Sequence, residues 1–356
     1  MKTAGRAIGT ALCLALTGAL VGLAKTWPGF LFAWYPALSR HFMARLGAIT
    51  AVCPLSVAEI GLGLIILWAL FTFVRMLRGK SGILRWLTGL TLGLSILVLF
   101  FVASWGLNFF DPTSLADRLE LPVSGYTQSQ LQSAAEFYLA RANDYSDQIP
   151  RDEEGRASFG AFRALAEESG QGYDALAAEY PFFLHSENLP KPVIASRLMS
   201  YCGITGIFSA FTGEANLNTD TPDASLPYTM AHERAHAQAV CPEDECNFAA
   251  YLACEASDSA ALRYSGYYSA FVYCYNALHR VNAQAAAAVW AQMSPGVEAD
   301  ARYSAVHYAQ YEGKTREAAE KVNDTYLKTF QQEEGVQSYD AVTTLLIAWY
   351  LSGRAE

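Results

Sequence analysis

The chain has 356 residues, 52% of them apolar, and a formal net charge of −9 at pH 7. This length predicts one or two domains. The apolar fraction is too high for an ordinary soluble enzyme, and the acidic balance excludes nucleic acid as an expected partner.

Three apolar runs near the N-terminus account for the excess of hydrophobic residues, and they cover residues 7–24, 57–77 and 86–110. Each run is long enough to span about 30 Å of hydrocarbon as a helix. Residues 1–110 are therefore expected to form a membrane domain with three transmembrane helices in the lipid bilayer. For the first run the alternative is a cleaved signal peptide, since Lys2 and Arg6 precede a short apolar core.

The basic residues predict the orientation of these helices. Four of them lie close together where the second run ends and the third begins, namely Arg75, Arg78, Lys80 and Arg85. The N-terminus and the loop between these two runs are expected to be cytoplasmic, so that residues 111–356 form an extracytoplasmic domain. The charge agrees with this division, because residues 1–110 carry a net charge of +8 and the remainder carries −17.

Residues 111–356 are numerous enough for one substantial domain. Apolar residues at helical spacing predict helices over residues 127–144 with Thr127 as cap, and over 158–168, 173–179, 243–256, 259–281, 283–293, 298–310, 317–330 and 339–351. Between residues 190 and 220, β-branched and aromatic residues interrupted by glycines predict two or three strands, within 193–194, 201–211 and 215–218. The expected fold class is mainly α with a small β-sheet (α+β).

The sequence His232-Glu233-x-x-His236 follows these strands, on a helix that Pro227 is expected to open. Side chains four residues apart on a helix lie nearly above one another, so both imidazoles can bind one metal ion. Glu233 lies close enough to face a water molecule on that ion. The spacing is typical of a zinc site with a carboxylate as general base. The alternatives are a chance match and a buried helix whose histidines are only hydrogen-bonded.

Glu243 is the expected third ligand. A straight continuation of the motif helix would carry Glu243 about 10 Å beyond His236, so the chain must turn sharply before Pro242. Pro242 favours the first position of a new helix, which places Glu243 in its first turn and Asn247 one turn later on the same face. Asn247 can then orient a ligand. The competing carboxylates are Glu245, which would face away, and Glu255, which lies more than two turns further along.

The expected extracytoplasmic domain contains five cysteines, at positions 202, 241, 246, 254 and 274. An exported domain can form disulfides, and an odd number leaves at least one thiol free or paired between chains. Cys246 and Cys254 lie on one predicted helix and are expected to be small core residues.

The run from Pro190 to Ala270, together with WGLN at 105–108, VNDTYLK at 322–328 and SYDAVTTLLIAWY at 338–350, resembles the bacterial membrane protein family known as domain of unknown function 3810. This resemblance implies a zincin-like metallopeptidase fold. Glu243 to Ala250 is similar to the Glu-x-x-Ala-Asn-x-x-Ala helix of the gluzincins, with Cys246 in place of the first alanine. That similarity also selects Glu243 as ligand. In zincins, a strand before the motif helix pairs with an extended substrate.

The chemistry expected from these residues is hydrolysis of a peptide bond. Zn²⁺ held by His232, His236 and Glu243 keeps a coordination position open, and Glu233 would act as general base and return the proton to the leaving amine. The donor to the oxyanion is not selected, and the candidates are Tyr264, Tyr267, Tyr268, His279, His307 and Tyr326.

The expected function is that of a membrane-anchored zinc metallopeptidase, a hydrolase acting on peptide or protein substrates outside the cytoplasm. Two alternatives stay open. One is a metal-binding scaffold or receptor without turnover, and the other is a zinc amidase acting on cell-envelope polymers.

The predicted topology can be tested with reporter fusions. A reporter fused after Glu356 should behave as exported, and one fused at Lys80 should behave as cytoplasmic, because the basic loop is retained inside. Paired fusions of an enzyme that is active only after export and of a protein that fluoresces only in the cytoplasm provide the measurement. The opposite pattern at both sites would reverse the orientation.

Overall fold

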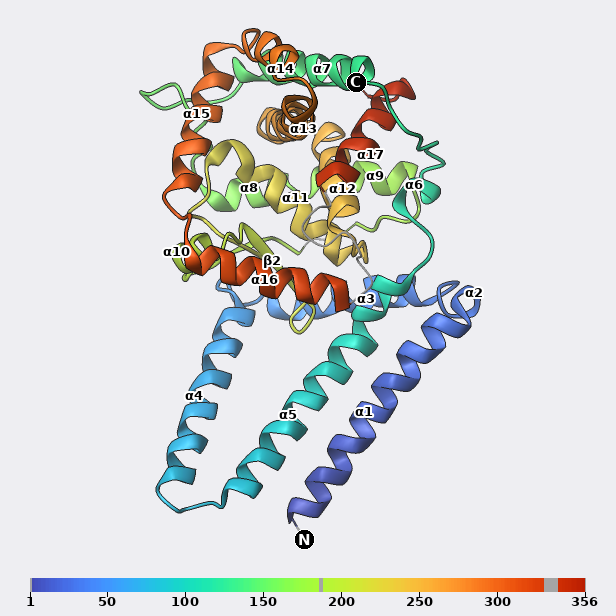
Figure 1. The fold of residues 1–356 in the computed structure, drawn as a ribbon, viewed down its shortest axis with the longest axis vertical. Coiled ribbons are helices and arrows are strands. Elements are labelled where there is room, and N and C mark those ends of the chain that lie inside the picture. The colour runs from blue at the N-terminus through green and yellow to red at the C-terminus, as the bar shows by residue number, and fades with distance from the viewer. Residues whose placement is uncertain (1, 186–187, 330–338, 356) are drawn as a thin grey trace. The chain divides into compact units, whose positions relative to one another are not determined.

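The computed structural model describes residues 2–185, 188–329 and 339–355 (Figure 1). The chain divides into two compact units. The first, the membrane unit, contains Met1–Pro112 and Ser209–Glu214, and the second, the helical unit, contains Thr113–Phe208 and Ala215–Glu356. The first break falls two residues beyond the boundary expected from sequence, and the inclusion of residues 209–214 in the membrane unit was not expected.

The membrane unit is built on α1 (Lys2–Thr26), α4 (Val57–Leu77) and α5 (Ile83–Ser104), which run side by side in Figure 1. All three are long and apolar enough to cross a membrane, as predicted. The third helix ends at Ser104, before the end of the predicted run, because Gly106–Phe110 forms a separate 3₁₀ helix. α1 packs along α5, where a Cβ atom at Gly9 would lie 3.0 Å from Leu92 Cδ1. The guanidinium of Arg6 donates a hydrogen bond of 2.7 Å to the Arg85 carbonyl.

Two helices between α1 and α4 were missed by the sequence analysis, α2 (Pro28–Leu31) and α3 (Tyr35–Thr50). α3 is fixed to the end of α5, because Ser39 Oγ donates to the Ser104 carbonyl at 2.9 Å. Asn108 Nδ2, in the 3₁₀ helix η1 (Gly106–Phe110), donates to Ser39 Oγ at 2.9 Å. These polar contacts come from residues far apart in the sequence, so helical periodicity does not reveal them.

Residues 209–214 form the tip of a hairpin and bond within the membrane unit. Thr50 Oγ1 donates to the Thr212 carbonyl at 3.0 Å. The Glu214 carboxylate accepts hydrogen bonds from the backbone N–H groups of Val57 at 3.2 Å and Ala58 at 2.8 Å. Since the first N–H groups of a helix lack partners within it, Glu214 stabilises the start of α4.

The helical unit contains twelve α-helices within its described residues, of which most match the predicted segments. They are α6 (Leu115–Arg118), α7 (Gln128–Ser146), α8 (Phe162–Glu168), α9 (Gln171–Glu179), α10 (Ser196–Tyr201), α11 (Leu226–Ala237), α12 (Glu243–Glu255), α13 (Ala260–Val281), α14 (Ala283–Trp290), α15 (Pro295–Ala309), α16 (Lys314–Thr329) and α17 (Tyr339–Leu351). Thr127 caps α7 as predicted, in a reciprocal pair with Gln130. A short 3₁₀ helix, η2 (Asp223–Ser225), precedes α11.

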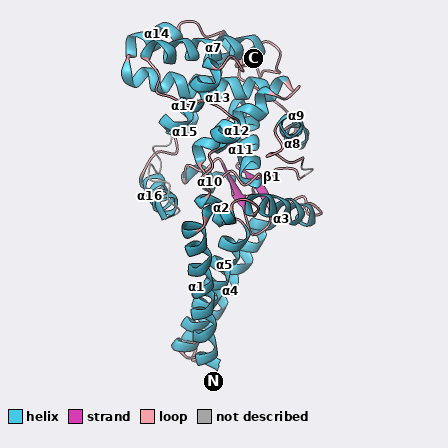
Figure 2. Ribbon diagram, turned by 90° about the vertical axis from the view of Figure 1, so that its right-hand side faces the viewer, coloured by secondary structure: helices cyan, strands magenta, loops and turns pink. Residues whose placement is uncertain are grey.

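A small sheet precedes the motif helix, as predicted. In the described part of the chain it has the strands β1 (Lys191–Pro192), β2 (Gly206–Ser209) and β3 (Glu214–Leu217) in the order β1-β3-β2 (Figure 2). β1 and β3 are parallel, with Lys191 opposite Asn216. The strand predicted to begin at Tyr201 starts only at Gly206, because residues 196–201 close backbone hydrogen bonds of a short helix.

The core of the helical unit is centred on α13, which packs against α7, α11 and α12. Buried tyrosines fill this contact, and Tyr138 and Tyr251 lie edge to face at 5.4 Å. The Glu255 carboxylate, buried at the end of α12, accepts hydrogen bonds from Tyr251 Oη at 2.5 Å and from Trp349 Nε1 at 2.9 Å. α17 is thereby attached to the core. Cys246 and Cys254 are buried in α12, as expected.

The contact between α9 and α12 leaves no room for a side chain at Gly172. A Cβ atom there would lie 1.7 Å from the Ala253 carbonyl oxygen. Gly172→Ala should therefore lower the free energy of unfolding by about 1–3 kcal/mol or more, since the helices must separate. Thermal unfolding of the full chain in detergent, followed by fluorescence, measures the loss.

Gly125→Ala is the matched control, because a Cβ atom at Gly125 meets nothing within 4 Å. Its unfolding midpoint should stay near that of the unsubstituted chain. Equal midpoints for the two variants would show that the α9–α12 contact is looser than described.

Candidate metal centre

The motif helix α11 carries His232 and His236 one turn apart in its second half. Pro227 is the second residue of this helix, as its position in the sequence suggested. Most of the helix is buried, so both imidazoles are held among packed side chains. Their ring centroids are 5.0 Å apart.

A sharp turn follows α11, as predicted. Ala239 adopts a left-handed conformation with φ of 63°. Its N–H bonds the His236 carbonyl at 3.1 Å, and the N–H of Val240 bonds the Ala235 carbonyl at 3.3 Å. This pair of bonds is a Schellman motif, which usually has glycine at the left-handed position. Pro242 is the N-cap of α12 and not its first residue, a shift of one position from the prediction.

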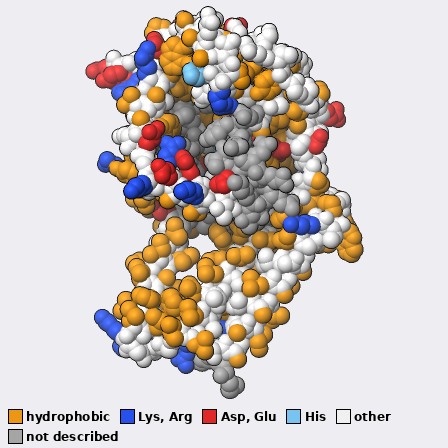
Figure 3. Space-filling view, in the orientation of Figure 1, with side chains coloured by type: hydrophobic (Ala, Val, Ile, Leu, Met, Phe, Trp, Pro, Cys, Tyr) orange, Lys and Arg blue, Asp and Glu red, His pale blue; other side chains and the backbone are white. Residues whose placement is uncertain are grey.

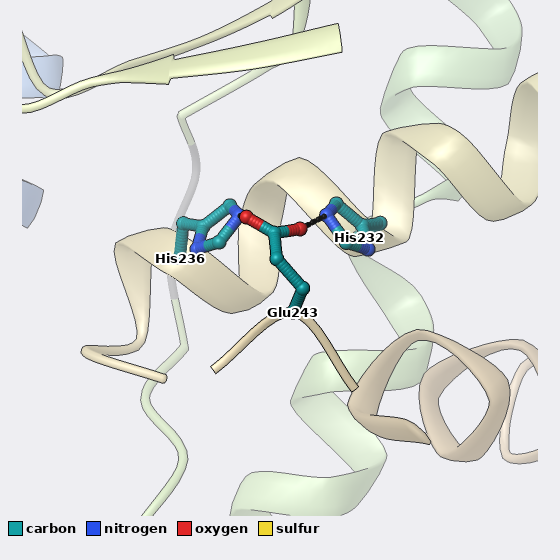
Figure 4. A group of neighbouring side chains, drawn as sticks. All are labelled: His232, His236 and Glu243. Atoms are coloured by element: carbon teal, nitrogen blue, oxygen red, sulfur yellow. Dashed lines mark ion pairs between the residues drawn. The ribbon is translucent and has the colours of Figure 1, made fainter. Parts of the chain in front are cut away.

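The turn brings Glu243 back to the two histidines (Figure 4). Glu243 Oε2 lies 3.2 Å from His232 Nε2, and Oε1 lies 3.7 Å from His236 Nε2. One ligand atom from each of the three residues lies within 4.8 Å of the others. Among the described residues, no other group of three or more His, Cys, Asp or Glu side chains converges in this way. We call these three residues the triad.

The two other acidic residues considered as ligands lie outside the triad. Glu255 holds Tyr251 and Trp349 in the core. Glu245 lies in the first turn of α12 beside Glu243 but is not part of the convergent group.

The outer nitrogen of each imidazole faces an oxygen. His232 Nδ1 lies 2.8 Å from Asn247 Oδ1, which is the position expected for Asn247. His236 Nδ1 lies 3.1 Å from the Val240 carbonyl oxygen, and Cys246 Sγ lies 3.2 Å from the same nitrogen. An imidazole that donates from Nδ1 presents the lone pair of Nε2, which is the atom turned toward Glu243. The Val240 contact was not predicted, because a main-chain acceptor leaves no signal in the sequence. Cys246 was expected only as a small core residue.

The electrostatics of the triad follow from burial and mutual charge. Burial alone would lower the pKa of His232, but the hydrogen bond and charge of Glu243 outweigh it and raise that pKa to about 9. Burial would raise the pKa of Glu243, yet the two imidazoles hold it at about 2. Burial lowers the pKa of His236 to about 4. Without a metal, His232 and Glu243 thus form an ion pair at neutral pH, and a metal ion must displace the proton of His232.

Glu233 lies beside the triad and is only 4% exposed. Burial raises the pKa of its carboxyl to about 8. The backbone N–H of Phe208 in β2 donates a hydrogen bond to this carboxyl, while Oε2 has no hydrogen-bond partner. A buried polar atom without a partner is costly, and such atoms are concentrated at sites where a ligand or water completes the bonding.

The strand β2 fits directly against the motif. A Cβ atom at Gly206 would lie 2.5 Å from Glu233 Oε1, so only glycine permits this approach. The ring of Phe208 stacks on that of His236 with centroids 6.4 Å apart. Sequence reasoning predicted the strand, but not these two contacts, since they depend on how the strand and helix pack.

The candidates for the oxyanion donor form other contacts. Tyr264 donates to Asp300, Tyr268 donates to Ser304 at 3.4 Å, and His307 Nε2 lies 2.9 Å from the Asp220 carbonyl oxygen. Tyr267 stacks on Tyr145, and His279 lies against Tyr275. None of these contacts between described residues joins the triad. The side chain of Tyr326 falls outside the described residues.

Substitution of the first-turn carboxylates tests the assignment of the third ligand. The Glu243→Ala protein should lose tightly bound zinc, since two imidazoles alone give a weaker site. Glu245→Ala is the matched control on the same helical turn and should retain about one zinc ion per chain. Zinc stoichiometry of the purified proteins after dialysis provides the measurement. Retention by Glu243→Ala with loss by Glu245→Ala would reverse the assignment.

Comparison with known proteins places the chain in a family without supplying an activity. No curated protein and no solved structure matched the chain. The sequence model of one family, described as "Protein of unknown function (DUF3810)", matches residues 33–347. This match includes the triad, Glu233 and most of both units, and the chain therefore belongs to the DUF3810 family.

Proposed function

We propose that this protein is a membrane-anchored, zinc-dependent metallopeptidase that hydrolyses peptide bonds outside the cytoplasm. The observation that carries the proposal is the convergence of His232, His236 and Glu243, whose ligand atoms lie within 4.8 Å of one another. Two imidazole nitrogens and one carboxylate oxygen are a ligand set that zinc adopts in hydrolases. The Nδ1 atom of each imidazole faces an oxygen that can accept its hydrogen. The Nε2 atom of each ring is then the one that can bind a metal ion, which supports the proposal.

The candidate ligands fit a zinc ion in charge as well as in type. Glu243 is ionised and His236 is neutral near pH 7, as metal binding requires, and His232 must lose one proton when the metal binds. When bound, Zn²⁺ would act as a Lewis acid that stabilises charge on the scissile carbonyl oxygen and lowers the pKa of water.

Glu233 is the proposed general base and acid. Its carboxylate accepts a proton from the attacking water and delivers it to the leaving amine as the peptide C–N bond breaks. A pKa raised to about 8 keeps both protonation states accessible near neutral pH. The hydrogen bond from the Phe208 N–H helps to orient the carboxyl, and Oε2 is buried without a hydrogen-bond partner from the protein.

The position of β2 supports a peptide as substrate. β2 is at the edge of the described sheet, and its residues contact both Glu233 and His236. An edge strand can pair with an extended peptide through main-chain hydrogen bonds. A peptide held along β2 would bring successive carbonyl groups past Glu233. We therefore propose that residues 111–356 form a zincin-like domain of the gluzincin type.

Glu233→Gln separates proton transfer from metal binding. The amide has nearly the same shape but cannot accept the proton, so hydrolysis should fall by about 10²–10⁴-fold. The zinc content should be unchanged, because Glu233 is not in the triad. Cleavage of a quenched fluorescent peptide library by the full chain in detergent, with metal analysis of the same samples, provides both measurements.

His232→Ala is the comparison variant and should lose both zinc and activity. Loss of zinc from Glu233→Gln would show that Glu233 is a ligand. Zinc binding by the unsubstituted chain without cleavage of any peptide would favour a metal-binding scaffold. Release of envelope fragments without peptide cleavage would favour an amidase.

A further inference from the structure

The helical unit has a group of large apolar side chains in contact with solvent on α10, on β2 and in the segments next to them. They lie between residues 194 and 207, and their exposed fractions are 74% for Ile194, 63% for Leu198, 42% for Tyr201, 37% for Ile204 and 53% for Ile207. Single exposed apolar residues are common, whereas a concentration of them marks a surface that binds something. We call these five residues the α10–β2 surface.

Local structure holds this surface together. Leu198 and Tyr201 are three residues apart on α10 and share one of its faces. The N–H of Ile204 donates to the Met199 carbonyl at 3.0 Å, which folds the following loop back onto the helix. Ile207 is on β2, where it points to the side of the strand opposite Phe208. Since Phe208 faces His236, Ile207 points away from the triad.

The chain itself indicates what covers this surface. β2 ends at Ser209, where the hairpin tip of the membrane unit begins. In that unit, the ring of Phe211 stacks on Phe100 of α5 at 5.8 Å. Phe100 is four residues before the end of α5, about 6 Å along the helix axis. The hairpin tip therefore reaches the end of a membrane-spanning helix, and Ile207, two residues before Ser209, is within about 7 Å of it along the chain.

Aromatic and basic residues agree with a lipid interface. In the membrane unit, Trp27, Phe30 and Trp34 follow the first spanning helix and are 67%, 65% and 45% exposed. Aromatic side chains at the ends of spanning helices mark the headgroup region. In the helical unit, Arg197 is exposed next to Leu198, and a basic side chain at this position is attracted to anionic headgroups.

We propose that the α10–β2 surface inserts into the bilayer surface, and that the substrates are polypeptides anchored in the same membrane and cut close to it. This inference rests on the proposed peptidase function. Ile207 and Phe208 are neighbours in the chain, so lipid contact on one side of β2 places the triad on its other side within a few residue lengths of the headgroups. A polypeptide anchored in the bilayer can bring the segment next to its anchor to β2 while the anchor stays in the lipid. A dissolved peptide reaches β2 only from bulk water.

Photo-crosslinking tests the surface without requiring activity. A benzophenone amino acid replaces Leu198 or Val281 in the full chain, in vesicles of phosphatidylethanolamine and phosphatidylglycerol. Both positions are 63% exposed in the helical unit, which makes Val281 the matched control. Mass spectrometry should find phospholipid adducts after irradiation at position 198 and not at 281. Absence of lipid adducts at 198, or adducts there only to protein, would overturn the lipid contact.

Cleavage assays test the substrate class. One peptide is presented to the same vesicles either dissolved or carrying an acyl chain, and the anchored form should be cut at least about tenfold faster because it shares the membrane surface. Leu198→Glu should remove most of this preference, since a buried charge in lipid is costly, while zinc content and cleavage of the dissolved peptide stay unchanged. Val281→Glu should change none of these quantities.

The outcomes separate the two proposals. If neither peptide is cut although zinc is bound, the peptidase function and the substrate class are both wrong, and lipid adducts at position 198 still establish the surface. If both peptides are cut at equal rates, the peptidase function stands and the preference for anchored substrates is overturned.

Discussion

The candidate centre depends on the turn between α11 and α12. Its two backbone hydrogen bonds, from Ala239 to His236 and from Val240 to Ala235, reverse the chain within a few residues. The same turn directs the Val240 carbonyl at His236 Nδ1 and returns Glu243 to the open side of both imidazoles. Alanine in the left-handed conformation costs about 1 kcal/mol relative to glycine. The packing of α12 against α11 must offset that cost.

The two faces of the strand β2 have different neighbours. On one side Gly206 and Phe208 fix Glu233 and His236, which places a polypeptide edge next to the candidate catalytic carboxyl. On the other side Ile207 belongs to an exposed apolar surface. The strand then continues into a hairpin tip that belongs to the membrane unit. The proposed membrane contact is on the face of β2 opposite Phe208, and the proposed substrate pairing uses the hydrogen-bonding edge of the same short strand.

Burial and mutual charge together determine the protonation states of the triad. The ion pair of His232 with Glu243 stabilises the metal-free site at neutral pH, and zinc would replace the proton in that pair. Glu233 receives no comparable support, because one of its oxygens is buried without a partner and burial holds its pKa near 8. Burying this carboxyl with one oxygen unpaired is unfavourable for folding, and it is consistent with a role in proton transfer. By contrast, the structural carboxylate of Glu255 has a hydrogen-bond donor at each oxygen.

The sequence alone determined the elements whose signals are local. Apolar runs of about 20 residues predict membrane-spanning helices, and apolar periodicity predicts most helices of the second unit. The spacing of His232, Glu233 and His236, and Pro242 before Glu243, selected the convergent residues, because helix geometry fixes which side chains share a face. Tertiary structure alone decided α3, the hairpin tip at residues 209–214, the approach of Gly206 to Glu233 and the Val240 carbonyl behind His236. These features depend on close packing and main-chain hydrogen bonds between segments far apart in sequence, and neither leaves a pattern in residue type.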